Sequence, residues 1–578
     1  MKIKEEITEK TQSLIKDLFN TEVEIELEVP PKVELGDFAF PCFEIAKEIG
    51  EDPNSIAQKI KNNFPSLNFI KEVKATGPYL NFIIKREKFF NKIIGDVLRK
   101  ETDFFSPKLE KEKVMIEFIS PNSNKPLHIG HLRNACLGDS NAKILKECNK
   151  DVTKACLIND KGVPVFKSIL AWMKWHSNET PQKNNIKPDH FLGNLYVEYE
   201  KKKEDNPELK EEVQELVQRW EKEDKEIVEK FKNTNQLFLE GFKESIQKLG
   251  FDFDLIQFES EVYEEGKKII KKGLEDNIFK KEKGKIVALL PEEKFGKDKD
   301  GKVKKALLLR EDGTSVYLTQ DVGLAVKRFK EYDLDRLLYV VGSEQKSHFK
   351  RLFTVLEQLG YKWSENCTHI PYGLVDLPQG SMSSRKGNVV KLDDLIKKVK
   401  DLAREEIEKR YDLKKGELEE RAEKIMNAAI KFYLLRVNSS KNIQFDPKAS
   451  ISFEGSTGPY CQYAYARTQS ILKKAEIELD YDKIDFSYLG NKEEILLLRK
   501  IMELPQKIET AGKEYNPSFV ANSVYNIAKD FSVFYNKHSV LFAEDEKTKK
   551  ARLALTKATS EAIQKGLALL GIDVLKEM

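Results

Sequence analysis

The sequence has no apolar run of about 18 or more residues, the length that a membrane-spanning helix needs. Its first residues, MKIKEEITEK, contain no apolar stretch of the kind that a secretion signal requires. We therefore expect a chain that works in the cytoplasm and does not bind membranes.

Metal-binding and disulfide patterns are also missing. The cysteines are scattered and none forms a C-x-x-C pair; they are Cys42, Cys136, Cys148, Cys156, Cys367 and Cys461. This spacing argues against a zinc ribbon and against a disulfide framework. We expect reduced thiols, mostly in the core, and no structural metal.

An excess of one charge is lacking too. The net charge is only +3, so any contact with RNA must come from local patches and not from a basic arm. The sequence has no tandem repeat of fixed period and no low-complexity tract. What is present, 578 residues of which 40% are hydrophobic and 34% charged, indicates several folded domains.

Three segments of the chain differ in pattern. Residues 1–108 combine an acidic opening helix, the alternating run EVEIELEV and a turn-rich stretch, which indicates a small α+β domain. Residues 109–395 open with the apolar strand VMIEFI, a Pro/Asn/Ser loop and a helix from about Gly130 to Lys150, as a nucleotide-binding α/β unit does. Residues 396–578 are expected to be all helical, with amphipathic runs around 402–436, 457–476, 493–513, 518–540 and 547–570.

The α/β segment is interrupted. Residues 199–232 are dense in Lys and Glu with an apolar residue every three or four, which predicts solvated helix, and we assign an insertion to about 175–300. Strand-like stretches return at VALLP, ALLLR, VYLT and RLLYVVG. We expect them to complete the second half of a parallel sheet.

The loop SPNSNKPLHIGH, residues 120–131, carries the clearest chemistry. His128 and His131 can face one ligand, Gly130 lets backbone approach closely, and the helix N-terminus favours a phosphate. The alternatives are that the two histidines cap the helix or bind a metal. No third ligand is nearby, and the position after a strand favours a nucleotide.

A second loop, GSMSSRKGNVV at residues 380–390, is rich in hydroxyls and has adjacent cations at Arg385 and Lys386. It can close over a triphosphate and neutralise charge as pyrophosphate leaves. A flexible surface turn is the alternative interpretation.

Together, in this order about 250 residues apart, the two loops resemble the HIGH and KMSKS signatures of class I aminoacyl-tRNA synthetases. Further stretches resemble the arginine enzymes across nearly the whole chain: ELGDFAFPCFEIAKEIG, TGPYLNF, REDGTSVYLTQDVGLA, VVGSEQKSHF and FEGSTGPYCQYAYARTQSIL. The resemblance implies a Rossmann-type class I catalytic domain, an N-terminal domain that binds the tRNA elbow and a C-terminal anticodon-binding domain. It also implies an arginine–tRNA ligase that uses ATP with Mg²⁺ to form arginyl-adenylate and charge tRNA(Arg). We expect it to work as a monomer.

A pocket for arginine needs carboxylates, because a guanidinium has five donors and no acceptor. Asp321 can bind it in a bidentate pair with Tyr317 alongside; alternatively Asp321 is a helix N-cap and Tyr317 a strand core residue. The resemblance implies that Ser120, Asn122 and Gln345 hold the backbone groups of arginine, with Glu117 nearby. Each has a plain structural alternative, and Glu259 is our candidate for a second acid.

For ATP the resemblance implies His128, Gly130 and His131 in the first loop and Met382, Ser383 and Arg385 in the second. The second loop departs from the KMSKS pattern, because Ser381 and Ser384 stand where lysines are usual. In arginine enzymes with such a loop, a lysine before HIGH is thought to take over, and Lys125 has that position. We therefore expect Lys125, His128, His131 and Lys386 to be catalytic, with a solvated loop lysine as the alternative for Lys125.

Contacts with tRNA are expected at both ends of the chain. Tyr79 and Asn81 in TGPYLNF can bind an exposed base, or can simply be strand residues. Tyr460, Gln462 and Arg467 are the candidates for the anticodon, but they lie on successive helix faces and only some can point outward. Two rival functions are a class I synthetase for another amino acid and a catalytically idle RNA-binding relative.

Overall fold

The computed structural model describes residues 2–100, 104–378, 390–477 and 479–578. The N-terminal part is a three-stranded antiparallel sheet of order β1-β3-β2, with helices packed on it. Its elements are α1 (Lys2–Phe19), β1 (Phe38–Pro41), α2 (Phe43–Ile49), α3 (Pro53–Asn63), β2 (Ile70–Thr76), β3 (Tyr79–Ile84) and α4 (Arg86–Lys100). The run EVEIELEV is extended, and its apolar residues are more buried than its glutamates, but it joins the sheet only through a bridge between Glu28 and Ala39.

A parallel sheet of order β11-β10-β4-β5-β6 forms the centre of the chain. Its strands are β4 (Lys113–Glu117), β5 (Asp151–Ile158), β6 (Leu255–Phe258), β10 (Arg336–Gly342) and β11 (Cys367–Tyr372). The chain leaves β4 through α5 (Ile129–Glu147) toward β5, whereas β10 returns on the other side of β4. The strand order therefore reverses between β4 and β10, which is where open α/β sheets bind ligands.

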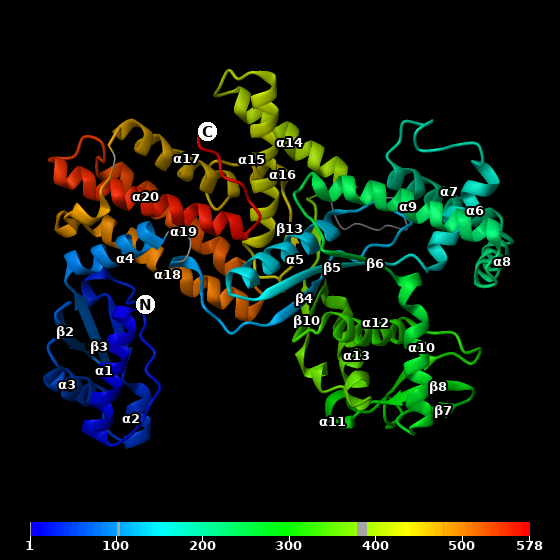
Figure 1. Cartoon of the computed structure of the whole chain (residues 1–578), viewed down its shortest axis with the longest axis horizontal. Helices are drawn as coiled ribbons and strands as arrows, with labels where there is room; N and C mark the ends of the chain where they lie inside the picture. Colours follow the sequence, from blue (N-terminus) through cyan, green and yellow to red (C-terminus); the bar gives the residue numbers. More distant parts are fainter. Residues whose placement is uncertain (1, 101–103, 379–389, 478) are drawn as a thin grey trace.

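Helices surround this sheet and extend from it. They are α6 (Val163–Trp175), α7 (Pro188–Asp205), α8 (Leu209–Glu221), α9 (Lys225–Gln247), α10 (Glu259–Glu275), α11 (Glu292–Phe295), α12 (Tyr317–Tyr332) and α13 (Lys346–Gln358). Figure 1 shows α6 to α9 grouped at one end of the molecule, far from the N-terminal domain. The expected insertion at 175–300 is not wholly outside the sheet, because β6 lies within it and pairs with β5.

Three of the four strand-like stretches do not join the parallel sheet. VALLP and ALLLR overlap β8 (Lys285–Leu289) and β9 (Lys305–Leu309), which form a separate antiparallel sheet with β7 (Lys280–Glu282). VYLT is not a strand, since helix α12 begins at Tyr317. Leu318, Val322 and Ala325 are buried at helical spacing, and this period outweighs the β-propensity of four residues.

The C-terminal part is helical, as predicted. Its helices are α14 (Leu392–Glu408), α15 (Lys415–Leu435), α16 (Pro447–Ser450), α17 (Gly458–Ala475), α18 (Lys492–Glu514), α19 (Ser518–Lys537) and α20 (Glu546–Leu569). The run 402–436 is divided between α14 and α15, and the expected boundary at 395 falls inside α14. A short strand, β13 (Ile443–Gln444), pairs with β12 (Val375–Asp376) and so joins this part to the part that contains the parallel sheet.

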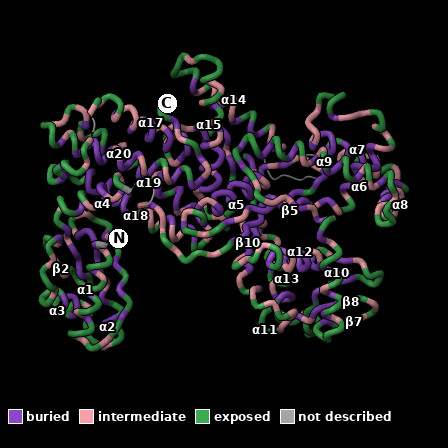
Figure 2. Tube along the Cα trace, in the orientation of Figure 1, coloured by how far each residue is buried: buried purple, intermediate pink, exposed green. Residues whose placement is uncertain are grey.

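The core is continuous between these parts. One cluster of buried apolar residues extends from the N-terminal sheet through the central sheet into the C-terminal helices, and a second lies around α12, α13 and β8–β9. Figure 2 shows the buried residues concentrated in the middle of the molecule. All six cysteines are buried and none is in a disulfide. No helix of the described residues is long and apolar enough to cross a membrane.

Candidate active site

A cavity of about 590 Å³ opens where β4 and β10 end, at the point where the strand order reverses. It brings together residues from the first signature loop, from α12 and from the turn after β10. Nine of the residues expected in the site line it: Glu117, Ser120, Asn122, His128, Gly130, His131, Tyr317, Asp321 and Gln345. Segments that are up to 228 residues apart in the sequence, from Glu117 to Gln345, thus share one wall.

The two histidines lie at the start of α5 with their ring centroids 3.9 Å apart. Nδ1 of His128 accepts the Gly130 N–H at 3.1 Å, and Nδ1 of His131 accepts the His128 N–H at 3.1 Å. The neutral rings must therefore carry their protons on Nε2, which leaves two Nε2–H donors for a ligand. His128 does cap the helix, as the alternative interpretation held, and the cap fixes its tautomer.

Burial keeps both rings neutral. It lowers the pKa of His128 to about 4, and the nearby Lys125 charge lowers it further in the same direction. The pKa of His131 is also well below its ordinary value, first because the ring is buried and then because of His128 and Lys125. At neutral pH the loop therefore offers hydrogen-bond donors and not imidazolium charges.

A strained turn links β4 to this loop. Ile119 and Ser120 both have positive φ, 70° and 40°, which costs free energy for residues with a Cβ. Asn134 holds the turn by accepting the Ile119 N–H, and the Ser120 hydroxyl donates to Glu117 at 3.1 Å. Glu117 is itself paired with the fully buried Arg328, so its charge is already compensated by the protein.

Asp321 lies in the second turn of α12, whose N-cap is Val316; it is therefore not the N-cap. Its Oδ2 is 2.5 Å from Nε2 of His348. Burial raises the pKa of this carboxyl, although the bond to His348 opposes the rise. Tyr317 begins the same helix, is 50% exposed and has its ring centroid 5.0 Å from that of His348.

Glu259, the candidate second acid, is the first residue of α10 and does not line the cavity. It is buried, with 8% of its surface exposed. Burial, and then the negative charges of Asp160 and Asp321, raise its pKa to about 7. It is therefore close enough to Asp321 for the two negative charges to interact.

Lys125 is half-buried beside the histidines and makes no ion pair or hydrogen bond within the described part of the chain. Burial lowers its pKa. An unpaired, partly buried ammonium of this kind is suited to receive an anion. The four expected residues of the second loop, Met382, Ser383, Arg385 and Lys386, lie outside the described residues.

The residues expected to contact tRNA have different surroundings. Tyr79 is 36% exposed and packs edge-on against Phe43, whereas Asn81 is only 3% exposed. Gln462 is fully buried and donates to the carbonyls of Lys424 and Asp573. Tyr460 and Arg467 are half-buried, the first bonded to Ser532 and the second to Tyr463. Tyr79, Tyr460 and Arg467 thus keep some exposed surface, and Asn81 and Gln462 keep almost none.

Asn134 and His348 are among the cavity residues that sequence reasoning missed. Asn134 follows His131 by three residues, on the same face of α5, and donates to the Val340 carbonyl at 2.7 Å and to Tyr372 at 3.2 Å. Helical spacing from His131 is the signal that would have found it. His348 stands three residues after Gln345 in α13, but its contact with Asp321 depends on how α12 and α13 pack.

Comparison with known proteins agrees with this geometry. Three family models match: the class I (R) tRNA synthetase catalytic domain over residues 94–447, the DALR anticodon-binding domain over 461–578 and the arginyl-tRNA synthetase N-terminal domain over 1–84. The chain is similar to the arginine–tRNA ligases of Treponema denticola (39% identical, covering 96% of this chain and 95% of the relative) and Borrelia hermsii (39% identical, covering all of both).

The fold agrees as well. The solved arginyl-tRNA synthetase of Thermus thermophilus superposes with a TM-score of 0.83 at 25% identity, over 99% of this chain and all of the other. The family match covers more than half of the chain, and the relatives match it from end to end. The chain therefore belongs to the arginyl-tRNA synthetase family of class I aminoacyl-tRNA synthetases.

Proposed function

We propose that this arginine–tRNA ligase activates L-arginine in the cavity between β4, α5 and α12, and then transfers it to tRNA(Arg). One observation carries the proposal. The cavity combines a buried carboxylate, Asp321, with two neutral imidazole donors, His128 and His131, at a helix N-terminus. A cationic amino acid and a nucleotide phosphate can therefore lie next to each other in it.

Asp321 recognises the guanidinium. His348 already bonds Oδ2, which leaves Oδ1 to accept a guanidinium N–H. Tyr317 covers the group from the exposed side. At the other end of the cavity Ser120, Asn122 and Gln345 contact the amino and carboxylate groups of arginine, with Glu117 nearby. Glu259, whose charge interacts with that of Asp321, adds negative charge.

In the first step the carboxylate of arginine attacks the α-phosphate of ATP, which binds as its Mg²⁺ salt, and pyrophosphate leaves. The Nε2–H groups of His128 and His131 donate to the phosphate oxygens as charge develops on them, and Gly130 lets the backbone approach. The ammonium of Lys125, which has no ion-pair partner among the described residues, neutralises the charge that a KMSKS lysine would otherwise neutralise. Arg385 and Lys386 assist it, and Met382 and Ser383 complete the ATP site. No protein nucleophile is needed, so positioning and electrostatics carry the step.

In the second step the terminal ribose hydroxyl of tRNA attacks the adenylate and AMP leaves. We assign residues 1–108 to the tRNA elbow, with Tyr79 and Asn81 as candidates, and residues 396–578 to the anticodon, with Tyr460, Gln462 and Arg467. Because charging serves translation, we place the protein in the cytoplasm. We further propose that it acts as a monomer.

The direct test is exchange of pyrophosphate into ATP with a panel of amino acids, with and without tRNA(Arg). We expect exchange with arginine and not with lysine. Exchange with another amino acid would make the chain a different class I synthetase, and no exchange or charging with a competent tRNA would support the idle relative.

The first prediction concerns specificity. Asp321→Asn should lower kcat/KM for arginine by an amount equivalent to about 2–4 kcal/mol of transition-state stabilisation, because it replaces a charged hydrogen bond with a neutral one. KM for ATP should change little. Glu331→Gln, on the exposed face of the same helix, is the control. A kcat/KM for arginine within about threefold of the parent would make the pocket assignment wrong.

A further inference from the structure

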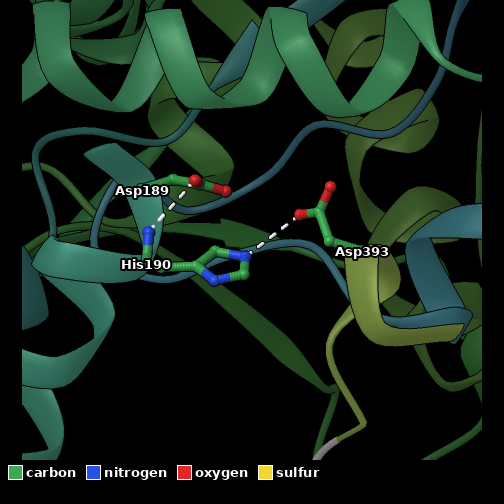
Figure 3. A group of neighbouring side chains, drawn as sticks. All are labelled: Asp189, His190 and Asp393. Atoms are coloured by element: carbon green, nitrogen blue, oxygen red, sulfur yellow. Dashed lines mark hydrogen bonds and ion pairs between the residues drawn. The ribbon is translucent and has the colours of Figure 1, made fainter. Parts of the chain in front are cut away.

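A cluster of polar side chains joins α7 and α9 to the first turn of α14. We call it the 393 cluster; it consists of Lys187, Asp189, His190, Ser245, Lys248 and Asp393. Figure 3 shows Asp393 reaching across from α14 toward the His190 ring, with Asp189 beside it. The cluster is not in the wall of the active-site cavity, and the proposed function does not use it.

Asp393 is the centre of the cluster. Its Oδ2 accepts from Lys187 at 2.9 Å, from His190 at 3.0 Å and from Ser245 at 3.0 Å, and Lys248 lies 3.4 Å from Oδ1. The side chain is only 15% exposed. Burial alone would raise the pKa of this carboxyl, but the bonds from His190 and Lys187 outweigh it, and the pKa falls below its ordinary value. Asp393 is therefore a charged anchor at neutral pH.

The residues just before Asp393 contact the first signature loop. The Leu392 N–H donates to the Leu127 carbonyl at 2.8 Å, and Lys391 forms an antiparallel bridge with His128. Helix α7 touches the same loop, since a Cβ on Gly193 would come within 2.6 Å of Pro126. The loop that carries the two histidines is thus held between α7 and the start of α14, and Asp393 joins these two elements.

A metal ion is the competing explanation, because ligand atoms of Asp189, His190 and Asp393 lie within 4.8 Å of one another. The cluster already contains a cation, however. The Lys187 ammonium is 2.9 Å from Asp393 and 3.2 Å from Asp189, which is fully buried. Lys187 therefore supplies the positive charge that a metal would supply. We call the contacts of Asp393 a latch, because they hold α7, α9 and α14 together.

We propose that Asp393 is a positioning residue for arginine activation: by fixing Lys391 and Leu392 against the Leu127–His128 backbone, it aims His128 and His131 at the phosphate. This inference rests on the proposed function. Hydrogen-bond donors in a reactive site are sensitive to small displacements, and a shift of about 1 Å can cost on the order of a hundredfold in rate.

The test compares Asp393→Asn with Asp394→Asn. Asp394 is in the same helical turn and the substitution removes the same charge, but Asp394 is exposed. We expect Asp393→Asn to lower kcat of pyrophosphate exchange roughly tenfold or more, with KM for arginine within about twofold, because the guanidinium site lies on α12. Asp394→Asn should behave as the parent.

A second measurement separates positioning from general damage. Hydrogen–deuterium exchange should be faster at the Leu392 amide in Asp393→Asn than in the parent or in Asp394→Asn, because that amide is bonded to Leu127. A parent that does not exchange pyrophosphate would defeat the proposed function itself. A parent that does, together with an Asp393→Asn variant of unchanged kcat and unchanged Leu392 protection, would defeat only the latch.

Two further outcomes are decisive. If circular dichroism shows that Asp393→Asn does not fold, His190→Gln takes its place, since it weakens one contact and keeps Lys187. A severalfold loss of kcat with unchanged KM for arginine is expected for it, and an unchanged kcat overturns the proposal. A stoichiometric transition metal in the purified parent that is lost from Asp393→Asn also overturns it, in favour of a metal site.

Discussion

Single residues around the cavity have protonation states set mainly by burial. Burial drives the pKa of His128 down to about 4 and that of Glu259 up to about 7. At neutral pH the histidine is therefore neutral, whereas Glu259 is near the midpoint of its titration. The phosphate side of the cavity should be insensitive to pH near 7, and the arginine side should not be.

This contrast gives a prediction at the residue scale. As pH rises from 6 to 8, Glu259 loses its proton and gains the negative charge that favours a guanidinium, so KM for arginine should fall severalfold while KM for ATP stays nearly constant. Glu259→Gln should flatten the profile. If the variant keeps the pH dependence of the parent, Asp321 is the titrating group and Glu259 is not the second acid.

How far single residues could be predicted depends on the length of chain between them. His128, Gly130 and His131 were predicted to share a site because a short loop and a helix start determine their relation, and all three line the cavity. Asp321 was predicted from the family resemblance and the chemistry of arginine, but its contact with His348 was not, because that contact requires the packing of α12 on α13. No sequence pattern predicted that Asn81 and Gln462 are buried.

Among the elements, α5 is bonded through a buried arginine to two segments that follow much later in the chain. The Arg133 guanidinium donates to the carbonyls of Gly373 at 2.6 Å and of Ser439 at 3.1 Å, with longer contacts to Leu374 and Asn438. Burial lowers its pKa to about 10, so it is charged at neutral pH. It ties α5 to the segment that leads into β12 and to the one that leads into β13.

The prediction at the scale of elements is that Arg133→Lys destabilises the protein by about 2–3 kcal/mol. Lysine keeps the charge but lacks the planar fork, so buried carbonyls lose their donor. Urea unfolding measures the effect, and Lys146→Ala on the exposed side of α5 is the control. A loss no greater than that of the control would mean that the carbonyls find other partners.

Helices could be predicted where the amphipathic pattern extends over several turns. The long C-terminal helices carry several turns of amphipathic pattern, and the structure has helices over those runs. VYLT failed because four residues are too few to show a period, and β8 and β9 were assigned to the wrong sheet because strand patterns do not specify a partner. The break between α14 and α15 lies inside a run that reads as one helix.

On the scale of the whole molecule, the N-terminal domain is docked on α18 through a buried charge. Asp37, which is fully buried, accepts from Arg499 at 2.9 Å and from Arg86 at 2.8 Å. Asp37 and Arg499 are 462 residues apart, so no local pattern predicts their meeting. The resemblance to a family did predict that both domains exist.

Arg499→Met should therefore cost about 3 kcal/mol, because it leaves a buried carboxylate with one cation in place of two. Calorimetry should show the N-terminal domain unfolding earlier than in the parent. Lys500→Met, which removes a partly exposed cation from the next position, should have little effect. Identical transitions in the two variants would show that the domains are held together by apolar packing alone.

The pairing of β12 with β13 has a thermodynamic consequence. Val375 and Asp376 line the cavity, and their register partners Ile443 and Gln444 belong to the helical part that we assign to the anticodon. Because β13 pairs with β12, a displacement of β13 by bound RNA also displaces the cavity wall. Coupling of this kind is reciprocal, so if tRNA tightens the binding of arginine and ATP by some factor, arginine and ATP must tighten the binding of tRNA by the same factor. The short pairing of β12 with β13 would then let the enzyme bind uncharged tRNA most tightly when arginine and ATP are already bound.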